Sequence, residues 1–253
     1  MKAAVFVITL FALVLVGVPG FSQEAEPVSN VSSPSGAVGD LSIQFKGVSS
    51  VGADDPDGLL NIIEGPITIE CWVQLDGFND NWTGLASWGF TYKMGISDDG
   101  QFLFTFFGVA DILSGYSLVP LVGDGQWHHL AGVWEPGAGV SFYVDGAMEA
   151  FVEQTGAPRE PESTNFTVGG EDVGNVPVTA KMDRVRIHNA VLTEADLDSN
   201  AASPKAPMAE TLVSYGFDEG SAPYKSTGSV SLDLLDQNAV AAPSAASNWE
   251  IYQ

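Results

Sequence analysis

Hydrophobic and polar residues alternate with a period of two through the middle of the chain. In residues 127–134 the even-numbered and odd-numbered positions form two distinct faces, and residues 140–144 repeat this alternation with Phe142 on the apolar face. The segment EPGAG at 135–139 separates the two runs and is rich in turn-forming residues. The pair Asp145–Gly146 favours a tight hairpin turn after the second run. This pattern predicts antiparallel strands with one buried face each.

Other short runs extend the same prediction. Residues 41–45, 67–75 and 101–107 read as strands, and turn-type residues separate them from their neighbours. Regular short strands of this kind are typical of an all-β sandwich. One short helix is expected after Thr193, which can cap the acidic run that follows. Cys71 is the only cysteine and shares the apolar face of its strand, so we expect a small buried side chain and no intrachain disulfide.

Four segments in a constant order resemble one known family. They are the run WHHLAGVW with the following SFYVDG, and the segments ITIECWV (67–73), FTVGG (166–170) and KMDRVRIHNAVLTEADL (181–197). The segments resemble the LamG-like jelly-roll domains of the concanavalin A-like lectin/glucanase superfamily. The resemblance implies an all-β, two-sheet antiparallel jelly-roll sandwich with one short helix near the C-terminal third. The fold does not settle the function, because it carries lectins, glycosidases and adhesion modules alike.

The two ends of the chain differ in composition from the middle. Residues 1–22 combine Lys2 with an apolar run and small residues, which predicts a secretory signal peptide cleaved after Ser22. The alternative is a membrane anchor, but the apolar run is shorter than the ~20 residues that a spanning helix needs. Residues 23–39 are predicted to be a flexible linker, and 40–253 the jelly-roll domain. The segment 210–253 either returns to complete the sandwich, which we favour, or begins a truncated second repeat.

The charge restricts the classes of partner. The chain has 9 Lys and Arg against 32 Asp and Glu, a net charge of −23 at pH 7. Such a chain repels nucleic acids and anionic membrane surfaces. A hydrophobic fraction of 45% is nevertheless too high for a disordered acidic chain. The charge thus argues against nucleic acid and membrane insertion, the signal peptide predicts export to the periplasm or the extracellular space, and the resemblance implies a glycan, a glycoprotein or another surface protein as partner.

Aromatic residues near predicted loops suggest a surface for sugars. We expect Trp82, Trp88 and Tyr92 to stack on sugar rings and the amides of Asn79 and Asn81 to bind hydroxyl groups. The alternative is that these aromatic side chains lie beneath covering loops.

Asp183 is the candidate metal ligand. It shares the parity of Val185 and Ile187, which predicts that it leans toward the core, where a carboxylate needs a partner. In related folds the matching aspartate binds calcium with backbone carbonyls, so the resemblance implies a Ca²⁺ site. The alternative is that Asp183 accepts backbone N–H bonds or pairs with Lys181 or Arg184.

Catalytic chemistry has weaker support. Glycoside hydrolysis requires two carboxylates across the scissile bond, and Glu70 stands alone on its predicted strand. His128 and His129 are adjacent and point to opposite faces of a strand, so they cannot share a zinc ion. We therefore expect no enzyme activity and a carbohydrate-binding or glycoprotein-binding module. The alternatives are a structural or adhesive surface component without a glycan ligand and, more remotely, a degenerate glycoside hydrolase.

Overall fold

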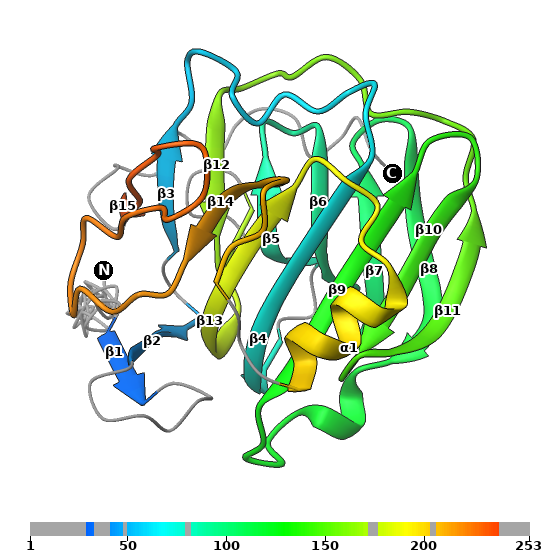
Figure 1. The fold of residues 1–253 in the computed structure, drawn as a ribbon. Helices are drawn as coiled ribbons and strands as arrows, with labels where there is room; N and C mark the ends of the chain where they lie inside the picture. The colour runs from blue at the N-terminus through cyan, green and yellow to red at the C-terminus, as the bar shows by residue number, and fades with distance from the viewer. Residues whose placement is uncertain are drawn as a thin grey trace, which may run out of the picture.

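The protein is a sandwich of two antiparallel sheets, as the alternating pattern predicts (Figure 1). The computed structural model describes residues 29–32, 41–47, 50–78, 82–171, 177–202 and 206–237. Sheet A has eight strands and sheet B has seven. The prediction of an all-β jelly roll with one short helix is confirmed.

Sheet A contains the central hairpin of the sequence. Its order is β1-β2-β13-β4-β9-β10-β11, and β14 pairs with β13 beside β2. The bounds are β1 Ser29–Ser32, β2 Leu41–Lys46, β4 Ile67–Gly77, β9 His128–Glu135, β10 Gly139–Val144, β11 Ala147–Glu153, β13 Thr179–His188 and β14 Thr211–Tyr215.

Sheet B lies behind sheet A in Figure 1 and has the order β15-β3-β12-β5-β6-β7-β8. Its strands are β3 Val51–Asp54, β5 Thr83–Trp88, β6 Tyr92–Ile96, β7 Gln101–Phe106, β8 Ala110–Ser117, β12 Asn165–Val168 and β15 Leu235–Asp236. The helices are a 3₁₀ turn, Val119–Leu121, and α1, Glu194–Ala202. None of the helices in the described part of the chain has the length and apolarity to cross a membrane.

The core fills the space between the inner faces of the two sheets. Phe142 is fully buried and its ring lies 5.1 Å from that of Phe102 in sheet B. Gly132 faces the same core, where a Cβ atom would lie only 2.7 Å from the Phe104 ring, so this glycine allows the sheets to approach closely. Cys71 is also buried, and burial raises the pKa of its thiol. The predicted parities of the central strands are therefore confirmed.

The turn between β10 and β11 has the predicted chemistry. Asp145 and Gly146 have φ values of 51° and 82°, as a turn with two left-handed residues requires. The Asp145 carboxylate also accepts a hydrogen bond of 2.8 Å from the backbone N–H of His129. The turn is thus tied to the start of β9.

A bulge divides β13 into two halves. Met182 and Val185 both face the core, three positions apart, and Arg184 between them has φ of 49°. Asp183 therefore lies on the outer face, opposite Trp72, and the parity predicted for it is wrong. Period-two counting fails here because a bulge inserts one extra residue.

The bulge also separates the partners of β13. Strand β2 pairs with Thr179–Met182, whereas β14 pairs with Val185–His188. The segment that begins at 210 thus supplies a strand of sheet A that lies end to end with β2.

Helix α1 covers part of the outer face of sheet A (Figure 1). The hydroxyl of Thr193 accepts a bond from the Asp196 N–H, and the Asp196 carboxylate accepts one from the Thr193 N–H, which caps the helix reciprocally. Leu197 packs with Ala131 and Tyr143 in a small second apolar cluster. The helix is therefore held by its own cap and by apolar burial.

Candidate functional site

The outer face of sheet B carries a row of polar residues that crosses five strands. Each member pairs in register with the next, and we call the set the polar row. Four of its members are at most 3% exposed even though they lie on the outer side of the sheet. The row consists of Asp111, Thr105, Lys93, Ser87 and Thr167.

Lys93 is the centre of this face. Its ammonium lies 3.1 Å from the Glu171 carboxylate and donates to the carbonyl of Trp82 at 3.3 Å. It also lies 5.2 Å from the centre of the Phe107 ring. A buried ammonium is costly unless it is paired and hydrogen-bonded, and these contacts offset that cost. The chain thus holds a charged pair against an aromatic side chain.

Three half-buried aromatic residues contact Lys93 or one of its neighbours. Trp82, Phe90 and Phe107 each keep part of their surface exposed, and the rings of Phe90 and Phe107 meet edge to face at 5.3 Å. Aromatic faces of this kind stack on the C–H surface of a sugar ring. Rings held by neighbours lose little conformational freedom when a ligand binds.

Hydroxyl groups complete the chemistry of the polar row. Thr105 donates a hydrogen bond of 2.9 Å to the Asp111 carboxylate. The Thr167 hydroxyl is buried and has no hydrogen-bond partner within the described structure. An unsatisfied buried hydroxyl is costly and marks a position where a ligand or a water molecule can supply the missing bond. The groups of this face that reach the surface are the Asp111 carboxylate and parts of the three aromatic side chains, and carbohydrate recognition uses both kinds of group.

The structure brings only part of the predicted aromatic set to this face. Trp82 lies here, whereas Asn79 and Asn81 fall outside the described residues. Trp88 and Tyr92 are fully buried in the core, so the prediction that they form a sugar platform is wrong. Trp88 donates to Asp55 at 3.1 Å and Tyr92 donates to the Leu60 carbonyl at 2.8 Å.

The reason for the error is strand parity. Trp88 and Tyr92 alternate with Ser87 and Lys93, and one member of each pair must face inward. A lysine between two apolar residues in a strand was the signal that could have located this face in the sequence. Nothing in the sequence indicated that Glu171 is its partner, because the two residues are far apart along the chain.

The outer face of sheet A carries a second polar cluster, beneath α1. Glu70 is 1% exposed and contacts four side chains. The distances are 3.0 Å to His129, 3.2 Å to His188, 3.1 Å to Arg186, and 3.0 and 3.1 Å to Asn200 of α1. We call these five residues the Glu70 cluster.

The Glu70 cluster leaves its carboxylate no room for acid–base chemistry. Burial alone would raise the pKa of Glu70, but hydrogen bonds from His129 and His188 and their charges hold it well below its usual value. All of its oxygens accept bonds from protein donors, so the group is a structural clamp between sheet A and α1. The prediction that Glu70 stands alone holds only for its own strand, since its partners come from three other elements.

Asp183 lies in the same outer layer. It is fully buried, and its carboxylate accepts a bond of 2.6 Å from the Arg184 N–H and lies 4.0 Å from the Arg184 guanidinium. Calcium requires six to eight oxygen ligands, which backbone carbonyls near Asp183 would have to supply. Within the described residues no three Asp, Glu, His or Cys side chains gather as a metal site. The contacts with Arg184 are among those of the alternative prediction for Asp183, and the calcium site stays a prediction.

Comparisons with known proteins agree with the geometry. A comparison with curated proteins gave no match. Among solved structures, the chain is similar to a Bacteroides ovatus protein proposed to bind carbohydrate, with 19% identity and a TM-score of 0.59, over 76% of this chain and 58% of that one. It is also similar to domain 4 of AbnA, an extracellular GH43 arabinanase from Geobacillus stearothermophilus, in complex with arabinotriose, with 15% identity and a TM-score of 0.54, over 70% of this chain and 82% of that one. At such identities the likeness is one of fold.

A family model provides the assignment. The model described as concanavalin A-like lectin/glucanases superfamily matches residues 47–198, which contain most strands of both sheets, the polar row and Glu70. The chain belongs to the concanavalin A-like lectin/glucanases superfamily.

Proposed function

We propose that this protein is a secreted, non-catalytic module that binds carbohydrate on the outer face of sheet B. The observation that carries the proposal is the Lys93–Glu171 pair, with the half-buried Phe107 ring 5.2 Å from Lys93 and the half-buried Trp82 bound to Lys93 through its backbone carbonyl. Sugars present hydroxyl groups that donate and accept hydrogen bonds and C–H faces that stack on aromatic rings. This face supplies partners for both.

Two proteins of similar structure support the proposal, because both are described with a carbohydrate. The Bacteroides ovatus protein is proposed to bind carbohydrate, and the AbnA domain was solved with arabinotriose. Both share the sandwich fold with this chain. A ligand built of several sugar units would be long enough to cover more than one member of the polar row.

Several features favour binding over catalysis. Glu70 is buried within protein donors, and the Glu171 carboxylate is engaged by Lys93. A general acid or nucleophile needs access to the substrate and a second carboxylate across the bond. Release of reducing sugars from β-glucans above the background of a Trp82→Ala variant would show hydrolysis and refute the non-catalytic part of the proposal.

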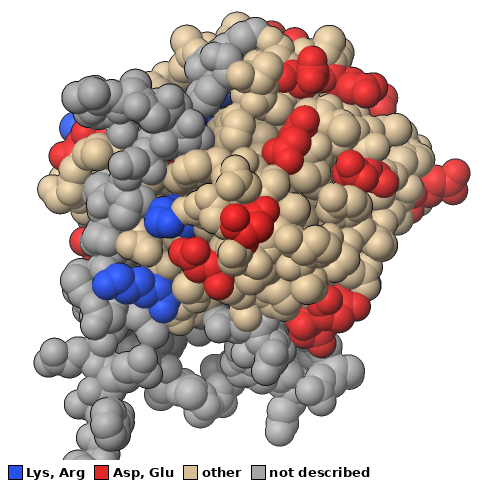
Figure 2. Space-filling view, turned by 90° about the horizontal axis from the view of Figure 1, so that it is seen from below, with Lys and Arg blue, Asp and Glu red and all other residues tan. Residues whose placement is uncertain are grey.

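The acidic surface supports a neutral ligand over a polyanion. Figure 2 shows Asp and Glu side chains spread over the face seen from below, with the few Lys and Arg gathered on one side. A net charge of −23 repels nucleic acids and anionic lipids at long range.

The decisive experiment is a glycan array followed by calorimetry with the best ligand. The Trp82→Ala variant should lose affinity by about tenfold, because a stacked aromatic face is worth roughly 1.4 kcal/mol. Trp72→Ala is the matched control: Trp72 is also half-buried but lies on sheet A, 5.7 Å from the His129 ring. Equal losses in both variants, or none in either, would contradict the placement of the site.

An adhesive or structural role without a glycan ligand is the competing proposal. A folded protein that binds no glycan on the array, with and without calcium, would favour it.

Export and calcium remain proposals that rest on the sequence. Residues 1–22 have the pattern of a signal peptide, and mass determination of the exported protein should place its N-terminus after Ser22. A calcium ion at Asp183 is likewise a proposal, which the family resemblance implies.

A further inference from the structure

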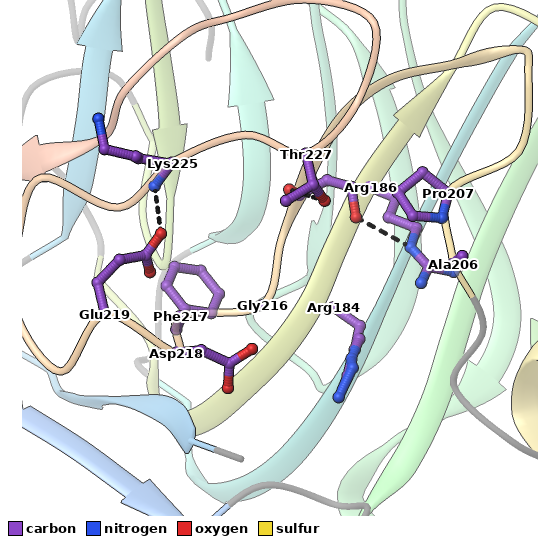
Figure 3. A pocket seen from close by; sticks show the side chains of 11 residues that line it. Arg184, Arg186, Ala206, Pro207, Gly216, Phe217, Asp218, Glu219, Lys225 and Thr227 are labelled. Carbon is purple, nitrogen blue, oxygen red and sulfur yellow. Dashed lines mark hydrogen bonds between the residues drawn. The ribbon is translucent and has the colours of Figure 1, made fainter. Parts of the chain in front are cut away.

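A pocket of about 460 Å³ lies between β13 and the chain that follows β14, and its charged groups already have partners (Figure 3). Its three cations are Arg184, Arg186 and Lys225. Each lies close to a carboxylate of the chain, at 4.0, 3.1 and 3.2 Å respectively. A ligand anion would have to compete with these carboxylates, so the cations of this pocket are compensated within the chain.

A second pocket has a volume of about 380 Å³ and lies at the turn between β7 and β8. This volume falls within the range of about 300–1,000 Å³ that is typical of sites for small molecules. Its lining residues are Phe106, Gly108, Val109, Ala110 and Asp111. Asp111 is also the end of the polar row on β8, the last strand in the order of sheet B. The pocket thus continues the proposed glycan face at its edge.

The carboxylate of Asp111 is positioned by the protein and keeps an oxygen for a ligand. Its Oδ1 accepts a hydrogen bond of 2.9 Å from the hydroxyl of Thr105, a residue that is only 3% exposed. The contacts described for Asp111 leave Oδ2 without a partner, and the side chain is exposed. A carboxylate only accepts hydrogen bonds and has about four sites for them. Asp111 therefore requires a ligand group that donates.

Two cations lie near this end of sheet B, and both are paired with other carboxylates. Lys93 lies 3.1 Å from Glu171. Arg159, whose guanidinium borders the β7–β8 turn, lies 2.6 Å from Glu162. Neither forms an ion pair with Asp111 in the described part of the chain. The net charge of −23 adds a field that attracts cations, so the unmatched charge at this pocket favours a cationic group.

We propose that the pocket at the β7–β8 turn binds an amino sugar unit of the glycan, whose ammonium group donates to Oδ2 of Asp111. A hydroxyl group of a neutral sugar also donates, but a hydrogen bond between two charged groups is stronger than one between neutral groups. The C–H surface of the sugar ring would lie against Val109, which lines the pocket and is 46% exposed. The inference rests on the proposed function, because it names the class of sugar that this same face takes.

The test is calorimetry of the full chain with the β-1,4-linked trimer of glucosamine and, as its neutral match, cellotriose. Measurements at about pH 6 keep the amino groups charged, since an α-amino group has a pKa of about 8. The glucosamine trimer should bind about fivefold more tightly than cellotriose, because its donor is charged. The Asp111→Asn variant should lose this preference. Asparagine keeps the oxygen that accepts from Thr105 and removes only the charge, so the fold is preserved.

Two further variants make the outcome specific. Asp98→Asn removes the same charge at an exposed turn position beyond the opposite end of β7 and should leave the preference unchanged. Trp82→Ala should weaken both trimers equally, because stacking on an aromatic ring does not require the ammonium group.

The results separate the inference from the proposed function. Equal affinities for the two trimers, both weakened by Trp82→Ala, would overturn the inference and leave the glycan face in place. An equal loss of preference in Asp111→Asn and Asp98→Asn would also overturn it, because the acidic surface as a whole would then attract the cation. Failure of both trimers and of every glycan on the array to bind would refute the proposed function itself.

Discussion

The outer faces of the two sheets both carry buried charges, but the charges are handled differently. On sheet A, Glu70 has four side-chain partners and α1 lies over the cluster. On sheet B, Lys93 contacts one carboxylate, the backbone carbonyl of the half-buried Trp82 and the ring of the half-buried Phe107. Both charges are held by protein partners, but α1 covers the Glu70 cluster, whereas the side chains near Lys93 include half-buried aromatic residues that can contact a ligand. The comparison identifies sheet B as the proposed glycan face.

The largest effect is expected from breaking the Glu70 cluster. Glu70→Ala should lower the free energy of unfolding by about 3–5 kcal/mol, because it leaves His129, His188 and Arg186 buried without their common partner. Denaturant unfolding at neutral pH measures the loss, and Glu149→Ala, at an exposed position on β11, is the control. Affinity for the glycan per folded molecule should not change. A loss of affinity in the folded variant would mean that the two faces are not independent.

The pH dependence of this effect has a definite sign. The pKa of Glu70 is held well below its usual value, so its contribution to stability is present above the ordinary carboxyl pKa of about 4.5 and is lost as pH falls through the lowered value. The difference between wild type and Glu70→Ala should therefore persist through the mildly acidic range and shrink only at strongly acidic pH.

The third prediction asks whether the buried carboxylate of Asp183 on sheet A is paired with a calcium ion. If Asp183 binds the ion, saturation at a hundredfold excess over Kd should stabilise the fold by about 2.7 kcal/mol. A chelator should then lower the Tm of the wild type, and Asp183→Asn should abolish most of that response. Magnesium at equal ionic strength controls for screening by any divalent cation. Identical responses to both cations, in both proteins, would rule out a specific site.

Removal of the Lys93 side chain should lower the free energy of unfolding by less than removal of the Glu70 side chain. Lys93→Met should cost about 1.5–3 kcal/mol, the range for a hydrogen bond to a charged group, because Glu171 remains partly accessible to water. The double variant Lys93→Met with Glu171→Gln should lose less stability than the sum of the losses in the two single variants, as expected for residues in contact. Thermal unfolding of the three variants completes the cycle, and strictly additive losses would show that the pair contributes no coupling energy.

The smallest effect is expected at the rim of sheet A, where a histidine is partly accessible. Burial would lower the pKa of His128, but hydrogen bonds to Asp145 at 2.8 Å and Asp124 at 3.0 Å raise it. Its contribution to stability is therefore fully present below the unfolded pKa of about 6.5 and is lost as pH rises through the higher folded value.

His128→Asn should consequently destabilise the protein by less than about 1 kcal/mol, and more at pH 6 than at pH 8.5. Urea unfolding at the two pH values checks the sign. A larger loss at the higher pH would mean that the two aspartates do not favour the charged imidazole.

The predicted and observed positions of functional residues diverge where strands are irregular or pair over long distances. Trp82 was predicted as a binding residue and lies on the proposed face, whereas Trp88 and Tyr92 are core residues. Alternate residues of β5 and β6 face the core and the outside, so Trp88 and Tyr92 face the core while Ser87 and Lys93 face outward. This assignment requires the strand bounds, which the sequence did not give. Asp183 is a similar case, because a single bulge reverses the face on which it lies.

The sequence by itself determined the class of fold, the central hairpin with its Asp145–Gly146 turn, the capped helix after Thr193 and the acidic character of the surface. These properties depend on local alternation, turn chemistry and composition, which act over a few residues. The tertiary structure alone decided that Glu171 meets Lys93, that Glu70 gathers partners from three other elements and that Arg184 and Arg186 share a pocket with Asp218. Those contacts join residues far apart along the chain, so they follow from strand order and register and not from any local pattern.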